Sequence, residues 1–164
     1  MTYQQRVYNT AAPRVGDLIA RFIVAQGAQE SANYTSSLFK KYNAAFGYMY
    51  NKDSKYQVKA GSKADNNAAI AAYANIEDAT KEVCDWLLRR TKDRRGGFPS
   101  SLSALDTPGK YVAAIKAAGY FEGPESVYAK NVAYYFEKLG KFVQTNSGLV
   151  SVVALLLVLY FVIK

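Results

Sequence analysis

The chain has 164 residues, of which 50% are hydrophobic, and carries a formal net charge of +8. This length can bury one modest core and leaves no room for two. Because the sequence holds no histidine and a single cysteine, it excludes His/Cys metal sites, Ser-His and Cys-His catalysis, and an internal disulfide framework. Any catalytic chemistry must use carboxylates, tyrosines, lysines or the backbone, and we expect neither a metal nor a cofactor.

The positive charge predicts an anionic partner, which could be nucleic acid, an acidic lipid surface or an acidic cell-wall polymer. The densest basic stretch, Leu87 to Arg95, is followed by Gly96-Gly97, so we interpret it as the solvated end of a helix, where cations suit the helix dipole. Non-specific nucleic-acid binding rests on charge alone and would show a steep salt dependence. Cys84 stands in the apolar pattern VCDWLL and is interpreted as a core thiol.

The first half of the chain shows helical spacing at both ends and a polar stretch between them. Residues 15–29 place apolar side chains and Gln26 on one stripe, which predicts a helix. Residues 33–42 are interpreted as a short helix or a loop. The lysine-rich segment 52–67 predicts a small hairpin or an exposed loop, and residues 76–90 return to helical spacing.

Two further helices are predicted in the second half. Thr107 and Pro108 suit the N-cap and the first position of a helix over residues 109–118, which ends at Gly119. A last helix is predicted from Pro124 to about Leu139. The predicted fold class is therefore mainly α, with a small β lobe between two helical parts.

The C-terminal segment, FVQTNSGLVSVVALLLVLYFVI, carries no charge over residues 142–163. As a helix, its apolar part from Ser147 onward would be roughly 25 Å long, close to the hydrocarbon thickness of a bilayer. The N-terminal residues resemble no secretory signal. We therefore expect residues 1–141 to form the domain and residues 142–164 to form one C-terminal transmembrane helix that anchors it in a lipid bilayer.

Glu30 is the candidate catalytic acid. It follows Ile23 and Gln26 at helical spacing, so its side chain is expected at the edge of the buried face. It also ends the helix, where the dipole disfavours ionisation. Both effects raise the pKa of Glu30, as a general acid that protonates a glycosidic oxygen requires. The alternative is a surface glutamate in a frayed last turn.

Three segments, in the same order, resemble the bacterial glucosaminidases of glycoside hydrolase family 73, which include the flagellar peptidoglycan hydrolases. The segment AQGAQESANYTSSLFKKYNAAFGYMY resembles the family's helix ending in Glu-Ser and followed by Asn-x-x-Phe-Gly. The segment IAAYANIEDATKEVCDWLLRR looks like its aromatic-x-x-Tyr-x-Ser-x-x-Glu motif, although Ala71 stands where an arginine is usual. The segment from Leu105 to Leu139 is similar to its closing pattern, a helix ending Ala-Gly-Tyr and then Tyr-Ala-x-Lys-Val.

The resemblance implies a lysozyme-like helical domain that cleaves the glycan strands of peptidoglycan as an endo-β-N-acetylglucosaminidase, with Glu30 as the acid. A second carboxylate is expected in the β lobe, at Asp65 with Asp53 in reserve, although Asp65 could equally be a loop residue or a helix N-cap. An inverting hydrolase needs that partner roughly 6.5 to 9.5 Å from the acid, whereas a substrate-assisted enzyme or a lytic transglycosylase needs one acid only. The implied substrate-binding residues are Ser31, Asn43, Phe46, Gly47, Tyr48, Tyr73, Tyr120 and Tyr128.

Several alternatives stay open at this point. A muramidase or a lytic transglycosylase could use the same fold, and a catalytically silent, membrane-anchored wall-binding or structural virion protein could keep the groove for attachment. Because Lys138 and Lys141 precede the apolar tail, the positive-inside tendency puts the domain on the cytoplasmic side. That side suits the internal membrane of a phage particle among other virion proteins better than a bacterial envelope, and no specific nucleic acid is expected as a partner.

Overall fold

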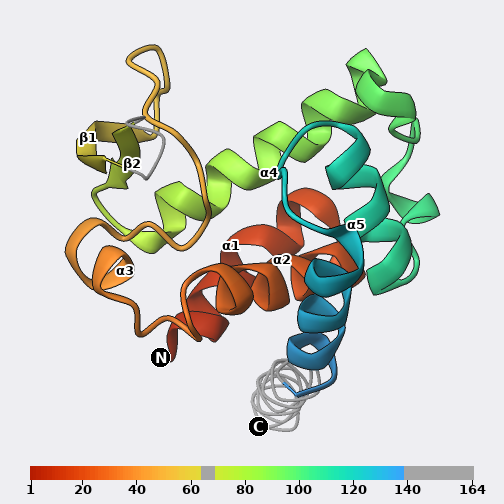
Figure 1. Cartoon of the computed structure of the whole chain (residues 1–164), viewed down its shortest axis with the longest axis horizontal. Helices are drawn as coiled ribbons and strands as arrows, with labels where there is room; N and C mark the ends of the chain where they lie inside the picture. The colour runs from red at the N-terminus through yellow and green to blue at the C-terminus, as the bar shows by residue number, and fades with distance from the viewer. Residues whose placement is uncertain (64–68, 139–164) are drawn as a thin grey trace, which may run out of the picture.

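The computed structural model describes residues 1–63 and 69–138, and its helices carry one small sheet at the side (Figure 1). In chain order the helices and strands are α1 (Tyr3–Val15), α2 (Asp17–Glu30), α3 (Ser37–Tyr42), β1 (Gln57–Lys63), β2 (Ala69–Tyr73), α4 (Ile76–Asp93), the short 3-10 helices η1 (Arg95–Gly97) and η2 (Leu102–Ala104), and α5 (Pro108–Ala117). A further helix covers residues 125–138. The mainly helical class with a small β lobe is thereby confirmed.

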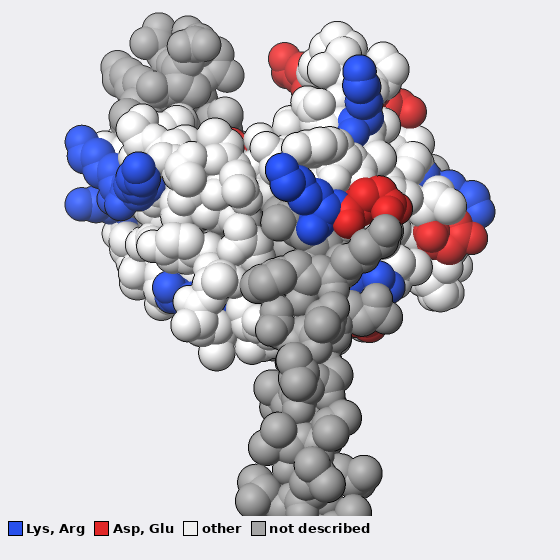
Figure 2. All heavy atoms as spheres, turned by 90° about the horizontal axis from the view of Figure 1, so that it is seen from below, with Lys and Arg blue, Asp and Glu red and all other residues white. Residues whose placement is uncertain are grey.

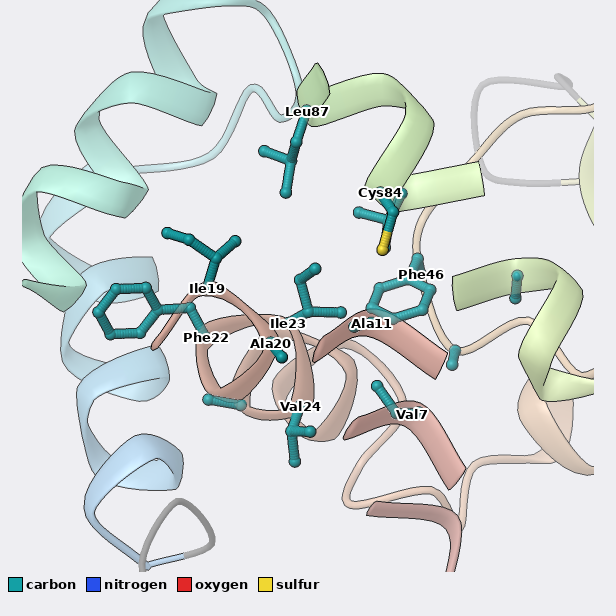
Figure 3. Close-up of a cluster of buried hydrophobic side chains, with 14 of the residues drawn as sticks. Val7, Ala11, Ile19, Ala20, Phe22, Ile23, Val24, Phe46, Cys84 and Leu87 are labelled. Carbon is teal, nitrogen blue, oxygen red and sulfur yellow. The ribbon is translucent and has the colours of Figure 1, made fainter. Parts of the chain in front are cut away.

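The core lies where α1 packs against both α2 and α4. Ile19 and Ile23 of α2 point toward Leu87 and Cys84 of α4, and Phe46 joins this cluster from the loop after α3 (Figure 3). Each such side chain that is fully buried stabilises the fold by about 1.5–3 kcal/mol. Cys84 is buried, which raises the pKa of its thiol to about 12, so it is the core thiol that the sequence predicted.

Helix α1 is an element that the apolar spacing did not predict. Only Val7, Tyr8 and Ala11 of its residues are buried, so the stripe is too narrow to stand out in the sequence. Thr2 caps the helix by accepting a hydrogen bond from the Gln5 backbone. Pro13 lies in the last turn, where it removes a single backbone hydrogen bond and does not break the helix.

A hairpin is present beside the helices, but only its first strand lies in the predicted segment 52–67, and the second begins after that segment, at Ala69. Strands β1 and β2 are antiparallel, Gln57 is paired with Tyr73, and the register shifts twice along the pair. Met49, ahead of the hairpin, forms a single bridge with Ile70. The segment that joins the two strands, residues 64–68, contains Asp65 and lies outside the described residues.

The predicted starts and ends of the later helices agree with the structure. Thr107 accepts a hydrogen bond from the Lys110 backbone as the N-cap of α5, and Pro108 is the first helical residue. Gly119 follows α5 with a φ of +81°, a conformation that glycine adopts without steric penalty. Helix α4 ends at Asp93, so most of the basic stretch from Leu87 to Arg95 forms its last turns.

The predicted transmembrane helix is not supported, and the predicted fold class is corrected on this point. Among the helices within residues 1–63 and 69–138, none is long and apolar enough to cross a bilayer. Helix α4 has 18 residues, but acidic and basic side chains recur along it. The predicted anchor, residues 142–164, lies outside the described residues. The location predicted from that anchor, with its lipid and virion partners, stays a prediction.

Positive charge is spread over the surface in separate groups. On the face in Figure 2, the lysines and arginines of the described residues form several separate groups among uncharged side chains, and acidic residues stand beside some of these groups. This face shows no continuous basic track of the kind that follows a nucleic-acid backbone.

Candidate active site

Glu30 is the last residue of α2, and its half-buried side chain lines a cavity of about 180 Å³, called here the Glu30 cavity. Helix α2 is followed by a left-handed turn, in which Ala32, Asn33 and Tyr34 all have positive φ angles, between 50° and 62°. This turn brings the loop after α3 back against the end of α2. The other residues that line the cavity are Ser36, Leu38, Ala44, Phe46, Gly47, Met49 and Ile70.

The Glu30 carboxylate accepts four hydrogen bonds. The Tyr128 hydroxyl and the Gln26 amide donate to Oε1, the latter at 2.9 Å. The Gly47 backbone N–H and the Tyr120 hydroxyl donate to Oε2, the latter at 3.1 Å. Donors from α2 itself, from the loop after α3 and from the chain after α5 therefore hold the carboxylate in one position.

Burial raises the pKa of Glu30 above its ordinary value because the charged form loses contact with water. The hydrogen bonds from Tyr128, Gln26, Gly47 and Tyr120 favour the charged form and oppose this effect without cancelling it. The end of α2 acts in the same direction as burial, because the helix dipole is negative there. Glu30 can therefore keep its proton closer to neutral pH than an ordinary glutamate, which is the property of a general acid.

The loop after α3 supplies both an anchor and a close approach to Glu30. Phe46 is 1% exposed, so its ring fixes the loop in the core. The next residue, Gly47, lies so near that a Cβ atom added to it would be 3.1 Å from Oε2 of Glu30. The Phe-Gly pair thus brings a backbone N–H to the carboxylate at a place where a side chain would press against it.

The two tyrosines that contact Glu30 come from the chain after α5. Tyr128 lies in the helix over residues 125–138 and stacks on Phe121 with ring centres 4.1 Å apart. Tyr120 makes edge contacts with Tyr48 and with Trp86 of α4, at 5.5 and 5.4 Å between ring centres. Burial raises the pKa of the Tyr120 and Tyr128 hydroxyls, so both stay protonated and act as donors at neutral pH.

A larger cavity, of about 550 Å³, lies along α4 and shares Met49 with the Glu30 cavity. We call it the α4 cavity. Its lining residues are Tyr48, Met49, Asn51, Asp53, Ser54, Lys55, Tyr56, Gln57, Glu82, Asp85, Trp86 and Arg89. Aromatic rings beside amides and charged groups suit a sugar, whose ring faces are apolar and whose edges carry hydroxyl and acetamido groups.

A model of the glucosaminidase family, described as mannosyl-glycoprotein endo-beta-N-acetylglucosaminidase, matches residues 6–147. The chain belongs to the glucosaminidase family. It is therefore a glycoside hydrolase of the kind that acts on peptidoglycan, and the family recognised from three short motifs in the sequence is confirmed.

One solved structure with a similar fold is that of a type VI secretion system effector-immunity complex from Pseudomonas protegens. The TM-score is 0.57 at 15% sequence identity, and the likeness covers 84% of this chain and 87% of that one. At this identity the likeness concerns the fold alone. The search among curated proteins found no match to this glucosaminidase.

Five of the residues singled out in the sequence meet at the Glu30 cavity. Glu30, Phe46 and Gly47 line it, and Tyr120 and Tyr128 donate hydrogen bonds to Glu30. They come from the end of α2, the loop after α3 and the chain that follows α5.

Ser31, Asn43 and Tyr73 serve the framework around the cavity. Ser31 is fully buried, and its hydroxyl donates to the Gly27 carbonyl and accepts from the Tyr34 backbone, which shapes the turn after α2. Asn43 donates from its amide to the Tyr73 carbonyl at 3.0 Å and so ties the loop to the end of β2. The Tyr73 hydroxyl donates to Glu82 at 2.6 Å, on the side of the α4 cavity.

Tyr48 and Asp53 line the α4 cavity and not the Glu30 cavity. Tyr48 lines the α4 cavity, and its buried hydroxyl has no hydrogen-bond partner among the described residues. Asp53 is exposed on the rim of the same cavity, and Asp65 lies outside the described residues. Within the described ranges, no cluster of three metal-binding side chains occurs.

Gln26 and Tyr111 belong to the site although the sequence gave them no role. Tyr111 of α5 is fully buried, and its hydroxyl donates to Oε1 of Gln26, whose Nε2 donates to Glu30. The sequence did carry a signal for Gln26, because it is a polar residue on the apolar stripe of α2, one turn before Glu30. Tyr111 carried none, since it comes 85 residues after Gln26.

Proposed function

We propose that this glucosaminidase cleaves the glycan strand of peptidoglycan internally, as an endo-β-N-acetylglucosaminidase, and that Glu30 is its general acid. The observation that carries the proposal is the Glu30 carboxyl itself. It lines a cavity, its pKa is raised by burial, and four donors hold it in place. A surface glutamate in a frayed helix end would have none of these features.

In the first step, a glycosidic oxygen bound in the Glu30 cavity takes the proton of Glu30 while its bond to the anomeric carbon breaks. Negative charge then develops on the Glu30 carboxylate. The hydroxyls of Tyr120 and Tyr128 and the Gly47 N–H already point at the oxygens that gain this charge. Such preorganised donors stabilise the transition state more than the ground state, because the charge is larger there.

The two cavities support cleavage within a strand over removal of an end unit. An enzyme that cuts internally needs binding space on both sides of the acid. The Glu30 cavity and the α4 cavity meet at Met49 and differ in their other lining residues. Sugar units that extend past the cleaved bond would lie against Tyr48 and Trp86 in the larger of the two.

For the second step, we propose that Asp65 positions or activates the attacking water. The change Asp65→Asn is then expected to impair hydrolysis and leave the fold intact. Mass spectrometry of the products identifies the reaction. A reducing N-acetylglucosamine end supports the proposed activity, a reducing N-acetylmuramic acid end would show a muramidase, and a 1,6-anhydro product would show a transglycosylase.

The decisive test of the acid is Glu30→Gln in the full chain. The amide keeps the shape of the carboxyl but has no proton to transfer, so turnover of purified peptidoglycan should fall at least about 100-fold. The control is Glu122→Gln, which neutralises an exposed carboxylate and should leave turnover unchanged. Wall-degrading activity retained by Glu30→Gln would refute Glu30 as the acid.

A further inference from the structure

We infer that Tyr111 and Gln26 are positioning residues for Glu30. Tyr111 sets the orientation of the Gln26 amide, and the amide nitrogen in that orientation donates the hydrogen bond that holds Glu30 in place. The inference rests on the proposed function, in which Glu30 is the acid. It adds two residues that contact no substrate and act through Glu30 alone.

The three side chains form a short chain of hydrogen bonds through the interior. Gln26 lies one turn before Glu30 on α2, is 1% exposed, and donates from Nε2 to Oε1 of Glu30 at 2.9 Å. Tyr111 reaches Oε1 of Gln26 from α5 and is 0% exposed. A buried amide that left its oxygen or its nitrogen unpaired would destabilise the fold. Here both ends of the Gln26 amide are paired, one to each neighbour.

The Tyr111 hydroxyl decides which way the Gln26 amide points. If the amide were reversed, its nitrogen would face Tyr111 and its oxygen would face Glu30. The hydroxyl hydrogen of Tyr111 would then lose its acceptor, since Gln26 is the one hydrogen-bond partner that the described residues provide for it. An unpaired buried donor is unfavourable. Tyr111 therefore keeps the Gln26 nitrogen facing Glu30.

This orientation matters because the charged and the protonated forms of the Glu30 carboxyl bind different hydrogen-bond partners. The carboxylate accepts the Gln26 N–H, whereas the protonated carboxyl could also donate to a carbonyl oxygen. With the amide fixed, Gln26 favours the carboxylate and limits how far burial raises the pKa of Glu30. Without this donor the pKa should rise further, and the carboxyl should be free to leave the position from which it transfers its proton.

Other titratable groups near Glu30 do not obscure this effect. The titratable side chains that interact electrostatically with Glu30 are Tyr34, Tyr48, Tyr73, Tyr111, Tyr120 and Tyr128. Burial raises the pKa of every one of these hydroxyls, so all stay neutral across the range in which a glutamate titrates. The fall of activity at high pH, called here the basic limb of the pH profile, therefore reports the pKa of Glu30.

The test compares the pH dependence of kcat/KM for Gln26→Met, Tyr111→Phe and the double variant of the full chain. Activity requires protonated Glu30, so it falls as pH rises through the pKa of that carboxyl. Loss of one hydrogen bond to a charged group should move this basic limb upward by roughly one pH unit. Because Tyr111 acts through Gln26, the double variant should shift no further than Gln26→Met alone.

The control is Thr80→Val. It removes a fully buried hydroxyl that donates to the Ile76 carbonyl at 2.8 Å within α4, so the basic limb should stay where it is. Far-UV circular dichroism at each pH confirms that the variants are folded. If Gln26→Met does not fold, Tyr111→Phe still decides, because it deletes one oxygen atom only.

Three failures are distinguishable. If Glu30→Gln is inactive but the basic limb stays in place in both variants, the inference is wrong and the proposed function stands. Full activity of Glu30→Gln would overturn the proposed function and the inference with it. Additive shifts in the double variant would show that Tyr111 acts on Glu30 by a route other than Gln26.

Discussion

The hydroxyl of Tyr128 donates a hydrogen bond to Oε1 of Glu30, although the two residues stand 98 positions apart in the sequence. Tyr128 lies in the helix over residues 125–138, which packs on α2 where Phe136 contacts Phe22 at 4.8 Å between ring centres. The last helix that the structure describes thus supplies one of the donors to the Glu30 carboxylate at the end of α2. Loss of that donor should therefore change the pKa and the activity of Glu30.

The first prediction concerns this contact. Tyr128→Phe removes a donor to the carboxylate and keeps the ring that stacks on Phe121. The pKa of Glu30 should rise further above its ordinary value, since a hydrogen bond that opposes burial is lost. The basic limb of kcat/KM should move to higher pH, and kcat at the optimum should fall about tenfold.

The matched control for Tyr128→Phe is Tyr134→Phe in the same helix. Tyr134 is 55% exposed, and its hydroxyl contacts Lys138, so activity and its pH profile should be unchanged. Equal losses in the two variants would mean that the helix as a whole, and not the Tyr128 hydroxyl, supports the activity.

The second prediction concerns the close approach of Gly47. In Gly47→Ala the added Cβ would lie 3.1 Å from Oε2 of Glu30, so the carboxylate must shift by a few tenths of an ångström. Because small displacements of a catalytic group reduce its efficiency, kcat should fall about tenfold with an unchanged melting temperature. Gly123→Ala is the control, since an added Cβ there meets no atom within 4 Å. A fully active Gly47→Ala variant would contradict the proposed proton transfer from this position.

The spacing along α2 and the order of the family motifs together selected Glu30, and the motifs also selected Gly47, Tyr120 and Tyr128 on other parts of the chain. Neither source of information selected the buried pair that supports Glu30 from behind. Gln26 was placed on the same stripe, but its role depends on Tyr111 from α5. No local pattern carries information on which buried hydroxyl meets which amide.

The family motifs selected residues without separating framework from site. Asn43, Ser31 and Tyr73 match the motifs as well as Glu30 does, yet their side chains fasten a loop, a turn and a strand. A motif marks residues that the fold requires together. Some of them are required for hydrogen bonds that hold the framework, and not for contact with the acid. Only the contacts show that Tyr120 and Tyr128 reach the acid and Tyr73 does not.

The third prediction links the acid to stability. Burial raises the pKa of Glu30 in the folded chain, so as pH rises the unfolded chain loses this proton before the folded chain does. Folding stability therefore falls between the unfolded and folded pKa values, and Glu30→Gln removes that loss. The variant should melt a few degrees higher than the original chain near neutral pH, and the difference should vanish in acid.

Thermal unfolding followed by circular dichroism across this pH range measures the effect. Glu122→Gln, which replaces an exposed carboxylate, provides the control and should show no difference that grows with pH. If Glu30→Gln were less stable than the original chain at every pH, the prediction would be wrong. The four hydrogen bonds to the carboxylate would then stabilise the fold more than burial of its charge destabilises it.

The last prediction tests the framework that joins α4 to α5 through two adjacent glycines. Gly96 and Gly97 both have positive φ, +66° and +75°, so alanine at either is strained by roughly 1–2 kcal/mol. An added Cβ at Gly97 meets nothing within 4 Å, whereas at Gly96 it would lie 1.9 Å from the Ala117 carbonyl oxygen at the end of α5. Gly97→Ala should therefore lower the free energy of unfolding by about 1 kcal/mol, and Gly96→Ala by about 3 kcal/mol or more. Urea unfolding measures both values. Because the two variants share the same backbone strain, equal losses would show that α5 does not pack against Gly96 in solution.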